Sequence, residues 1–137
     1  MEFDYTVTTQ KDFNAAVLAV QEETVKAGFR VLYVHDVKQT LGEKGFTIEP
    51  MKIIEFCNAK SAYTVLQADI KIGLCLPCKI NVYVKDGPAS AEASAGKQTF
   101  ISGMRPIILS QFFPEAKLGT LPKEIDQLIQ NIINNAK

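Results

Sequence analysis

The spacing of apolar residues changes along the chain, and this change constrains the fold more than any other feature. In residues 3–8 the apolar side chains occupy every second position, which is typical of a half-buried strand. In residues 13–27 they recur at every third or fourth position, as along one face of a helix, and Gly28 can end that helix. A second strand is predicted at residues 29–35. A strand, a helix and a second strand in this order predict helices packed against a sheet.

The remainder of the chain repeats both spacings. The resulting order, β-α-β-α-β-α-β-β-α, predicts an α+β fold. We expect a single mixed, largely antiparallel β-sheet with helices packed on one face, as a two-layer sandwich. The further strands are predicted at 51–58, 77–85 and 99–102, the further helices at 37–44, 59–68 and 122–135, and residues 107–113 are predicted as a short helix or an apolar docking segment.

Length and composition predict one domain over residues 1–137, because 47% of the residues are apolar and 22% are charged, as in an average soluble domain. Asp86-Gly87 is a hairpin signal, and the small residues after it predict a protruding hairpin tip over 86–98. A C-terminal helix is expected within residues 120–137, with an isoleucine-rich stripe along one side.

Charge is balanced, with 15 basic and 15 acidic side chains and no block of either sign. This balance argues against nucleic acid and against an anionic membrane surface as partners. The first ten residues contain no apolar run of the kind found in signal peptides or membrane anchors. We therefore expect a cytoplasmic protein.

Three cysteines, Cys57, Cys75 and Cys78, are the main candidates for chemistry. Their odd number argues against a disulfide framework of the secreted kind. Cys75 and Cys78 form a Cys-x-x-Cys motif with Pro77 before the second cysteine. The motif leads into a predicted strand, whereas a thioredoxin-like site places its first cysteine at a helix N-terminus, where the macrodipole lowers its pKa. Thioredoxin-type catalysis is therefore disfavoured.

Three interpretations of the cysteines remain open. They can be small buried hydrophobic residues, as free cysteines often are. Cys57 and Cys78 can form a thiol-based redox sensor, with Cys75 as a resolving cysteine. A metal site, with zinc as the expected ion, can use the three cysteines with His35 or a water as the fourth ligand, provided that the strands of Cys57 and Cys78 are neighbours.

The residues around the cysteines provide few further groups for chemistry. Asn58, Glu55 and Pro77 are the candidates for supporting residues. Glu55 has no evident partner at a useful spacing in the sequence. His35 is the only histidine, so a hydrolase triad would have to use it as the base. We interpret it as a solvated histidine at the end of a strand, beside Asp36, which can orient its ring or cap the next helix.

Several motifs, taken together, carry a resemblance to a known family. They are Gly28-Phe29-x-Val31-Leu32, Ile53-x-Glu55-Phe56-Cys57-Asn58, Asp69, Gly73-Leu74-x-Leu76-Pro77-Cys78-x-Ile80-x-Val82-Tyr83 and Ser102-x-Met104-x-Pro106. From about Phe3 to Pro106 the sequence resembles the domain of unknown function 302 family. That resemblance implies a small bacterial α+β domain, often dimeric, with no established activity.

Within that family, the resemblance implies that cysteines at the positions of Cys57 and Cys78 are a feature of one branch, while Cys75 lies where the motif is permissive. It also implies that residues 88–96 are an insertion and that the chain after Pro106 is an extension. For function, we expect a non-enzymatic homodimer module that binds a small apolar ligand or a partner protein. The alternatives are the thiol sensor and the cysteine metal site.

Overall fold

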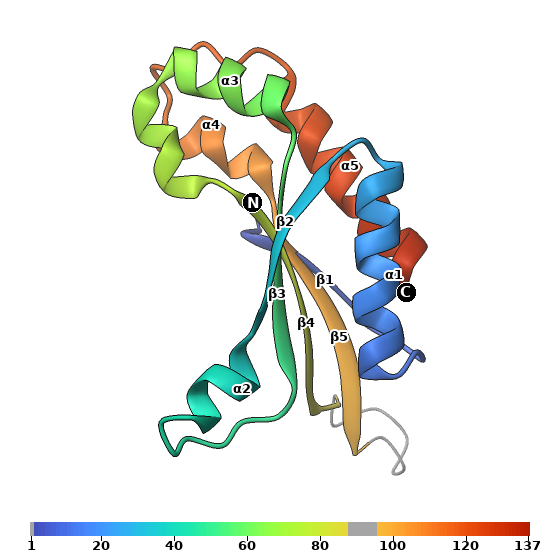
Figure 1. The fold of residues 1–137 in the computed structure, drawn as a ribbon. Helices are drawn as coiled ribbons and strands as arrows, with labels where there is room; N and C mark the ends of the chain where they lie inside the picture. Colours follow the sequence, from blue (N-terminus) through green and yellow to red (C-terminus); the bar gives the residue numbers. More distant parts are fainter. Residues whose placement is uncertain (1, 88–95) are drawn as a thin grey trace.

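An antiparallel sheet forms the centre of the molecule in the computed structural model, which describes residues 2–87 and 96–137. The sheet has five strands in the order β1-β5-β4-β3-β2, and each neighbouring pair is antiparallel, which confirms the expected α+β fold (Figure 1). The strands are β1 (Asp4–Thr9), β2 (Arg30–Asp36), β3 (Met51–Cys57), β4 (Cys78–Asp86) and β5 (Lys97–Met104).

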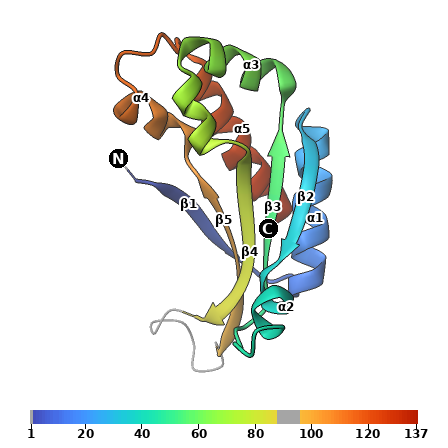
Figure 2. The same cartoon turned by 60° about the vertical axis from the view of Figure 1, so that its left-hand side comes forward.

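The helices occupy three places around the sheet (Figures 1 and 2). Helices α1 (Phe13–Lys26) and α5 (Leu121–Ala136) cover one face, and α1 joins the two edge strands, β1 and β2. A short helix, α2 (Val37–Gly42), lies at one end of the sheet. The other end carries α3 (Ala59–Ala68), the 3-10 helices η1 (Ile70–Cys75) and η2 (Pro106–Ile108), and α4 (Leu109–Phe112).

Side-chain caps fix where three of the helices begin. Asp12, Asp36 and Asn58 each accept a hydrogen bond from the backbone N–H three residues later, at 2.8, 3.0 and 3.0 Å. Such caps satisfy amide groups that have no partner within the helix. Asp36 therefore has the capping role that was one of its two predicted roles. Asp36 is the last residue of β2, and Asn58 directly follows the last residue of β3.

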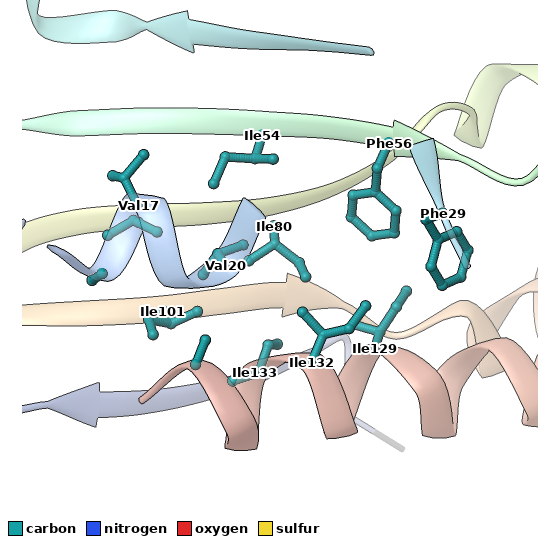
Figure 3. Close-up of a cluster of buried hydrophobic side chains, with 13 residues drawn as sticks. Val17, Val20, Phe29, Ile54, Phe56, Ile80, Ile101, Ile129, Ile132 and Ile133 are labelled. Carbon is teal, nitrogen blue, oxygen red and sulfur yellow. The ribbon is translucent and has the colours of Figure 1, made fainter. Parts of the chain in front are cut away.

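The larger hydrophobic cluster, called here the main core, lies between the sheet and helices α1 and α5 (Figure 3). Gly103 of β5 shows how close α5 approaches the sheet, since a Cβ there would lie 2.9 Å from Ile133 Cδ1. The buried members of the main core have almost no exposed surface: Ala16, Val17, Val20, Phe29, Ile54, Phe56, Ile80, Val82, Ile101, Ile129, Ile132, Ile133 and Ala136.

A smaller hydrophobic cluster, called here the satellite cluster, fills the end of the sheet that carries α3, η1 and α4. Its buried members are Val65, Ile72, Leu109 and Leu118. One segment here differs from expectation, because η1 forms where no helix was predicted. Residues 107–113 form part of η2 and α4, which agrees with the short helix that was one of the two predictions for them.

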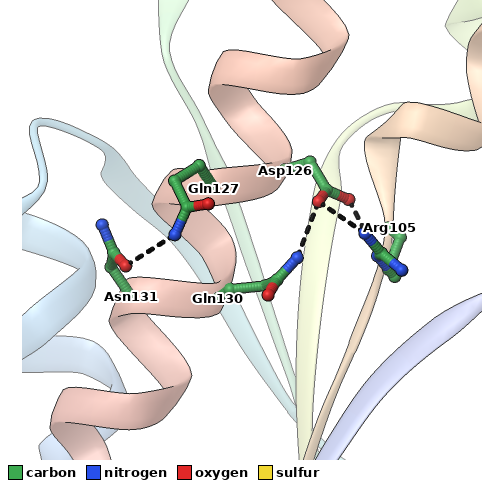
Figure 4. A network of polar contacts seen from close by, with 5 residues as sticks. All are labelled: Arg105, Asp126, Gln127, Gln130 and Asn131. Carbon is green, nitrogen blue, oxygen red and sulfur yellow. Dashed lines mark hydrogen bonds and ion pairs between the residues drawn. The ribbon is translucent and has the colours of Figure 1, made fainter.

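An ion pair joins the end of β5 to α5 (Figure 4). Arg105 donates from Nε and Nη2 to the two carboxylate oxygens of Asp126 at 3.2 and 3.1 Å, and Gln130 donates to Asp126 Oδ2 at 2.7 Å. The hydrogen bond to Asp126 raises the pKa of Arg105. Because Asp126 is only 5% exposed, these bonds satisfy a carboxylate that would otherwise be buried without a partner.

The predicted hairpin tip and the expected lack of a membrane anchor can be compared with the structure only in part. Most of the predicted hairpin tip, residues 88–95, lies outside the described residues. On either side of it, Asp86 pairs with Lys97, and the N–H of Gly87 donates to the carbonyl of Gly96 at 2.9 Å. Among the described residues, no helix has the length and apolar character needed to cross a bilayer.

Candidate functional site

Cys57 and Cys78 lie at the same end of the sheet because β3 and β4 are antiparallel neighbours. Phe56 pairs with Cys78 in the register, so Cys57 is the last residue of β3 and Cys78 the first of β4. Helix α3 begins directly after this point. Its cap, Asn58, also donates to the carbonyl of Gly28 at 3.3 Å, which ties the start of α3 to the turn before β2.

Both cysteines border one cavity of about 50 Å³. The atoms that its walls expose are apolar, although Asn58 and Ser61 belong to the lining. The other lining residues come from α3, from the segment before β4, and from η2, α4 and α5: Ala62, Val65, Leu76, Pro106, Leu109, Leu121, Pro122 and Ile125, together with Phe29 before β2.

The cavity lies at the seam between the two hydrophobic clusters. Phe29 belongs to the main core and Cys78 packs against it, whereas Val65 and Leu109 belong to the satellite cluster. We call this space the seam cavity. Two clusters that pack as separate units leave a gap where they meet, and here Cys57 and Cys78 are among the residues that line that gap.

An open groove continues from the seam cavity onto the surface of the molecule. It shares Ser61, Leu121 and Ile125 with the cavity lining and extends along α5 to Glu124 and Gln127. A ligand can therefore approach between α3 and α5. The groove is more open than the cavity and presents polar atoms as well as apolar ones.

The Cys78 thiol is protonated at neutral pH. Its pKa is raised from the ordinary 9.0 to about 11, mainly by burial and to a smaller extent by the nearby Cys57, while Lys79 acts in the opposite direction. Since the thiolate is the reactive species, Cys78 should react slowly with alkylating reagents at pH 7. Cys57 is near enough to act electrostatically on Cys78, and both are free cysteines.

Cys75 is separated from this pair, although it shares the Cys-x-x-Cys motif with Cys78. Its side chain packs against the satellite cluster, and it does not line the seam cavity. The Leu76–Pro77 peptide bond within the motif is cis, and Leu76, rather than Pro77, lines the cavity. In the described part of the chain, no three His, Cys, Asp or Glu side chains are placed to hold a metal ion.

His35 lies away from the cysteines, toward the other end of the sheet. It pairs with Ile53, four residues from Cys57 along β3, which corresponds to about 13 Å of strand. Its Nε2 contacts Glu55 Oε1, and its ring packs against Tyr33 at 4.6 Å between centroids. The predicted site of three cysteines with His35 is therefore not assembled.

The partner of Glu55 was missed in the sequence because it depends on how β2 and β3 pair. A register shift between Val31 and Tyr33 places His35 diagonally across from Glu55. The apolar wall of the seam cavity was missed as well. Val65 and Leu109 are ordinary core residues in the sequence, and no local signal indicates that they face the same cavity from different helices.

Taken together, the fold and the site define a small α+β domain with an apolar cavity at one end of an antiparallel sheet. A family model described as Domain of unknown function DUF302 matches residues 5–136, and the chain belongs to this family. The match includes α5, so the expectation that the resemblance ends at Pro106 is wrong.

A solved structure supports the same assignment. The crystal structure of the uncharacterized conserved protein DUF302 from Bacillus stearothermophilus is similar to this chain, with a TM-score of 0.86 and 28% sequence identity. The similarity covers 100% of both chains. The comparison with curated proteins found no match.

Proposed function

We propose that this protein is a non-enzymatic binding module whose seam cavity takes up an apolar group of a small ligand. The observation that carries the proposal is the cavity itself, whose exposed walls are apolar and which opens between α3 and α5. Concave, mostly apolar sites with a few polar groups at the margin are typical of small-molecule sites. Here the polar margin is provided by Glu124 and Gln127 of the groove.

The size of the cavity limits the ligand. A cavity of about 150 Å³ takes up benzene, whereas the seam cavity measures about 50 Å³. A narrow chain end therefore fits better than a ring. We infer a ligand whose apolar end enters the cavity while its polar end remains in the groove.

Titration with 1-octanol, followed by methyl NMR, tests this proposal. We expect the largest shifts at Val65, Leu109 and Ile125, which line the cavity from three helices. Replacing Ala62, a lining residue on α3, with leucine should fill the space and weaken octanol binding at least tenfold. Ala59→Leu is the matched control, because Ala59 is exposed on the same helix and does not line the cavity.

Two results would contradict the proposal. One is an octanol response at scattered surface methyl groups with none at the seam cavity. The other is equal binding by the Ala62→Leu variant and by the wild type, since a blocked cavity cannot contribute to binding.

We also propose that two copies pair through the helix-free face of the sheet. This face carries apolar side chains that α1 and α5 do not cover, among them the half-buried Met51, Ile53 and Met104. Both signs of charge stand on the same face, with Glu55 on β3 and Lys79 opposite it on β4. Such a face can be self-complementary, as a two-fold interface requires.

Sedimentation of the Ile53→Lys variant tests this pairing. The wild type should sediment as a dimer and the variant as a monomer, because the new charge would be buried in the interface. Gln127→Lys, on the exposed side of α5, should leave the dimer intact. A wild-type monomer at micromolar concentration would contradict the proposal.

A reversible disulfide between Cys57 and Cys78 is the second candidate function. The electrostatic effect of Cys57 on Cys78 and the cavity that both residues line support it. In the reaction with glutathione disulfide, the two thiols lose two protons and two electrons, and the glutathione disulfide becomes two glutathione thiols. The cytoplasm, where thiols stay reduced, is the proposed location for either function.

Intact mass and peptide mapping after incubation with glutathione disulfide test the sensor. A Cys57–Cys78 disulfide in the wild type and in Cys75→Ser supports it, and three unreacted thiols would contradict it.

Zinc is disfavoured among the alternatives, because two cysteines line the seam cavity and a structural zinc site uses four ligands.

A further inference from the structure

We propose that the ligand of the seam cavity is an amphiphile with a positively charged amine head, of the primary alkylammonium class, and that this head binds Glu124 in the groove. The inference rests on the proposed function, because it uses the same cavity and groove, and it adds the chemical class of the head group. Two properties of the groove between α3 and α5 support it, namely its charge and its capacity to form hydrogen bonds.

The charge of the groove is negative. Its lining combines three leucine or isoleucine side chains with Ser61, Glu124 and Gln127, so Glu124 is the one charged residue among the described residues that line it. The lysines beside these residues in the sequence, Lys60 and Lys123, are exposed and do not line the groove. Each is one or two positions from lining residues of its own helix, and residues at this spacing do not face each other. The groove therefore attracts a cationic head group and repels an anionic one.

The polar groups of the groove offer mainly hydrogen-bond acceptors. Gln127 already donates from Nε2 to Asn131 Oδ1 at 3.0 Å, which leaves its carbonyl oxygen for a ligand (Figure 4). Thr120 donates to Glu124 Oε1 at 3.4 Å, and none of the ion pairs in the described part of the chain includes Glu124. An ammonium group has three donors and no acceptor, so it matches these oxygens, whereas a carboxylate head has acceptors only.

Helix α5 places these acceptors beside the entrance of the cavity. Leu121 and Ile125 line both the cavity and the groove. Glu124 lies three residues after Leu121 and three residues before Gln127, and residues at this spacing are neighbours on a helix surface. One ammonium group can therefore contact Glu124 and Gln127 together, while the chain attached to it passes Ile125 into the cavity.

Three ligands of equal chain length, octylammonium, 1-octanol and octanoate, test the head group. Each is titrated into the full chain at pH 7 and low ionic strength, and methyl NMR follows Val65 and Leu109 in the cavity. We expect octylammonium to bind about fivefold more tightly than octanol and octanoate to bind about fivefold more weakly, which is the upper range for a partly exposed charge pair.

Variants of Glu124 separate the charge from the chain. Glu124→Gln should bring octylammonium binding to the level of octanol, and Glu124→Lys should reverse the order, so that octanoate binds more tightly than octylammonium. Glu115→Gln is the matched control and should keep the wild-type order, because Glu115 is an exposed acidic residue outside both linings. In the wild type, about 0.5 M sodium chloride should reduce the advantage of octylammonium over octanol, since salt screens exposed charges.

Two results would overturn the inference. One is equal binding of the three ligands by the wild type at low ionic strength. The other is a preference for octylammonium that persists in Glu124→Gln, which would place the head group elsewhere. In both cases, shifts at Val65 and Leu109 with octanol would leave the proposed function intact. A lack of shifts at these two residues with all three ligands would contradict the proposed function itself, and the inference with it.

Discussion

The main core and the satellite cluster are built in different ways. The main core joins a five-stranded sheet to two long helices, and most of its members have almost no exposed surface. The satellite cluster joins one ten-residue helix to short helical turns and a loop. The main core packs tightly enough to require Gly103, whereas the satellite cluster borders a cavity.

This difference explains where a binding site can arise without weakening the fold. A cavity in the main core would cost stability directly, because lost contacts there affect the whole sheet. At the seam, the cavity lining that α3 and α4 provide lies outside the ladder of hydrogen bonds between β3 and β4. The same seam receives both thiols, since β3 ends and β4 begins there.

The matched substitutions Ile80→Ala and Ile72→Ala should show the largest difference. Both isoleucines are 0% exposed, but Ile80 lies in the main core and Ile72 in the satellite cluster. Removing a buried isoleucine side chain costs about 2 to 5 kcal/mol, and less where the surroundings can collapse. We expect the loss in free energy of unfolding to lie near the upper limit of this range for Ile80→Ala and near the lower limit for Ile72→Ala. Urea denaturation of the two variants measures both losses. Equal losses would contradict the distinction between the two clusters.

The next largest effect concerns pH and the Cys78 thiol at the seam. Its pKa is 9.0 in an ordinary environment and about 11 in the fold, so the unfolded chain releases the proton first. The protonated Cys78 thiol therefore contributes to the free energy of unfolding. This contribution is fully present below pH 9 and is lost as the pH rises from 9 to 11. Two pKa units correspond to about 3 kcal/mol at most.

Denaturation of the wild type and of Cys78→Ser at pH 7, 9 and 10.5 measures this loss. The variant lacks the titrating thiol, so the difference in free energy of unfolding between the two proteins should change with pH in favour of the variant. A difference that stays constant over this range would show that Cys78 is not buried as described.

Adding a single Cβ at each of two glycines, one beside the main core and one beside the satellite cluster, tests how tightly the two clusters pack. Gly103→Ala would place its Cβ 2.9 Å from Ile133 and 3.1 Å from Ile129, whereas Gly73→Ala would meet Leu66 at an ordinary 3.5 Å. Overpacking of this kind costs about 1 to 3 kcal/mol. Thermal denaturation should therefore show a clear loss for Gly103→Ala and little change for Gly73→Ala. A tolerated Gly103→Ala would mean that α5 can move away from β5.

The smallest effect is expected from filling the seam. Ala62→Leu adds apolar volume to the cavity and should stabilise the protein by up to about 1 kcal/mol. Ala59→Leu on the exposed side of α3 should change stability less. A marked loss of stability in Ala62→Leu, measured by urea denaturation, would show that the seam has no room for the added side chain.

The sequence was most informative for elements whose structure depends on neighbouring residues in the chain. The helix predicted at 59–68 matches α3, because its apolar spacing and its Asn58 cap are local. The α+β class also followed from the strand and helix patterns. The pairing of the strands of Cys57 and Cys78 was only a condition of the metal-site interpretation, and the register of β3 and β4 meets it. By contrast, η1 was not among the predicted helices, because 3-10 turns have no strong apolar spacing of their own.

The site was less predictable than the fold, since it depends on contacts between distant segments. Cys57 and Cys78 could be singled out as residues, but the cavity between them requires Val65, Leu109 and Ile125 from three separate helices. The His35 and Glu55 contact depends in the same way on a register shift that no pattern in β2 indicates. Cys75 was misleading, because proximity in sequence to Cys78 did not place it at the cavity.

Xenon binding is the sharpest test of an apolar cavity at the seam, since xenon enters dry apolar cavities without hydrogen bonds. In crystals under xenon pressure we expect one xenon atom beside Val65 in the seam cavity of the wild type, and none there in Ala62→Leu. A seam without xenon in the wild type, or xenon bound only within the main core, would contradict it.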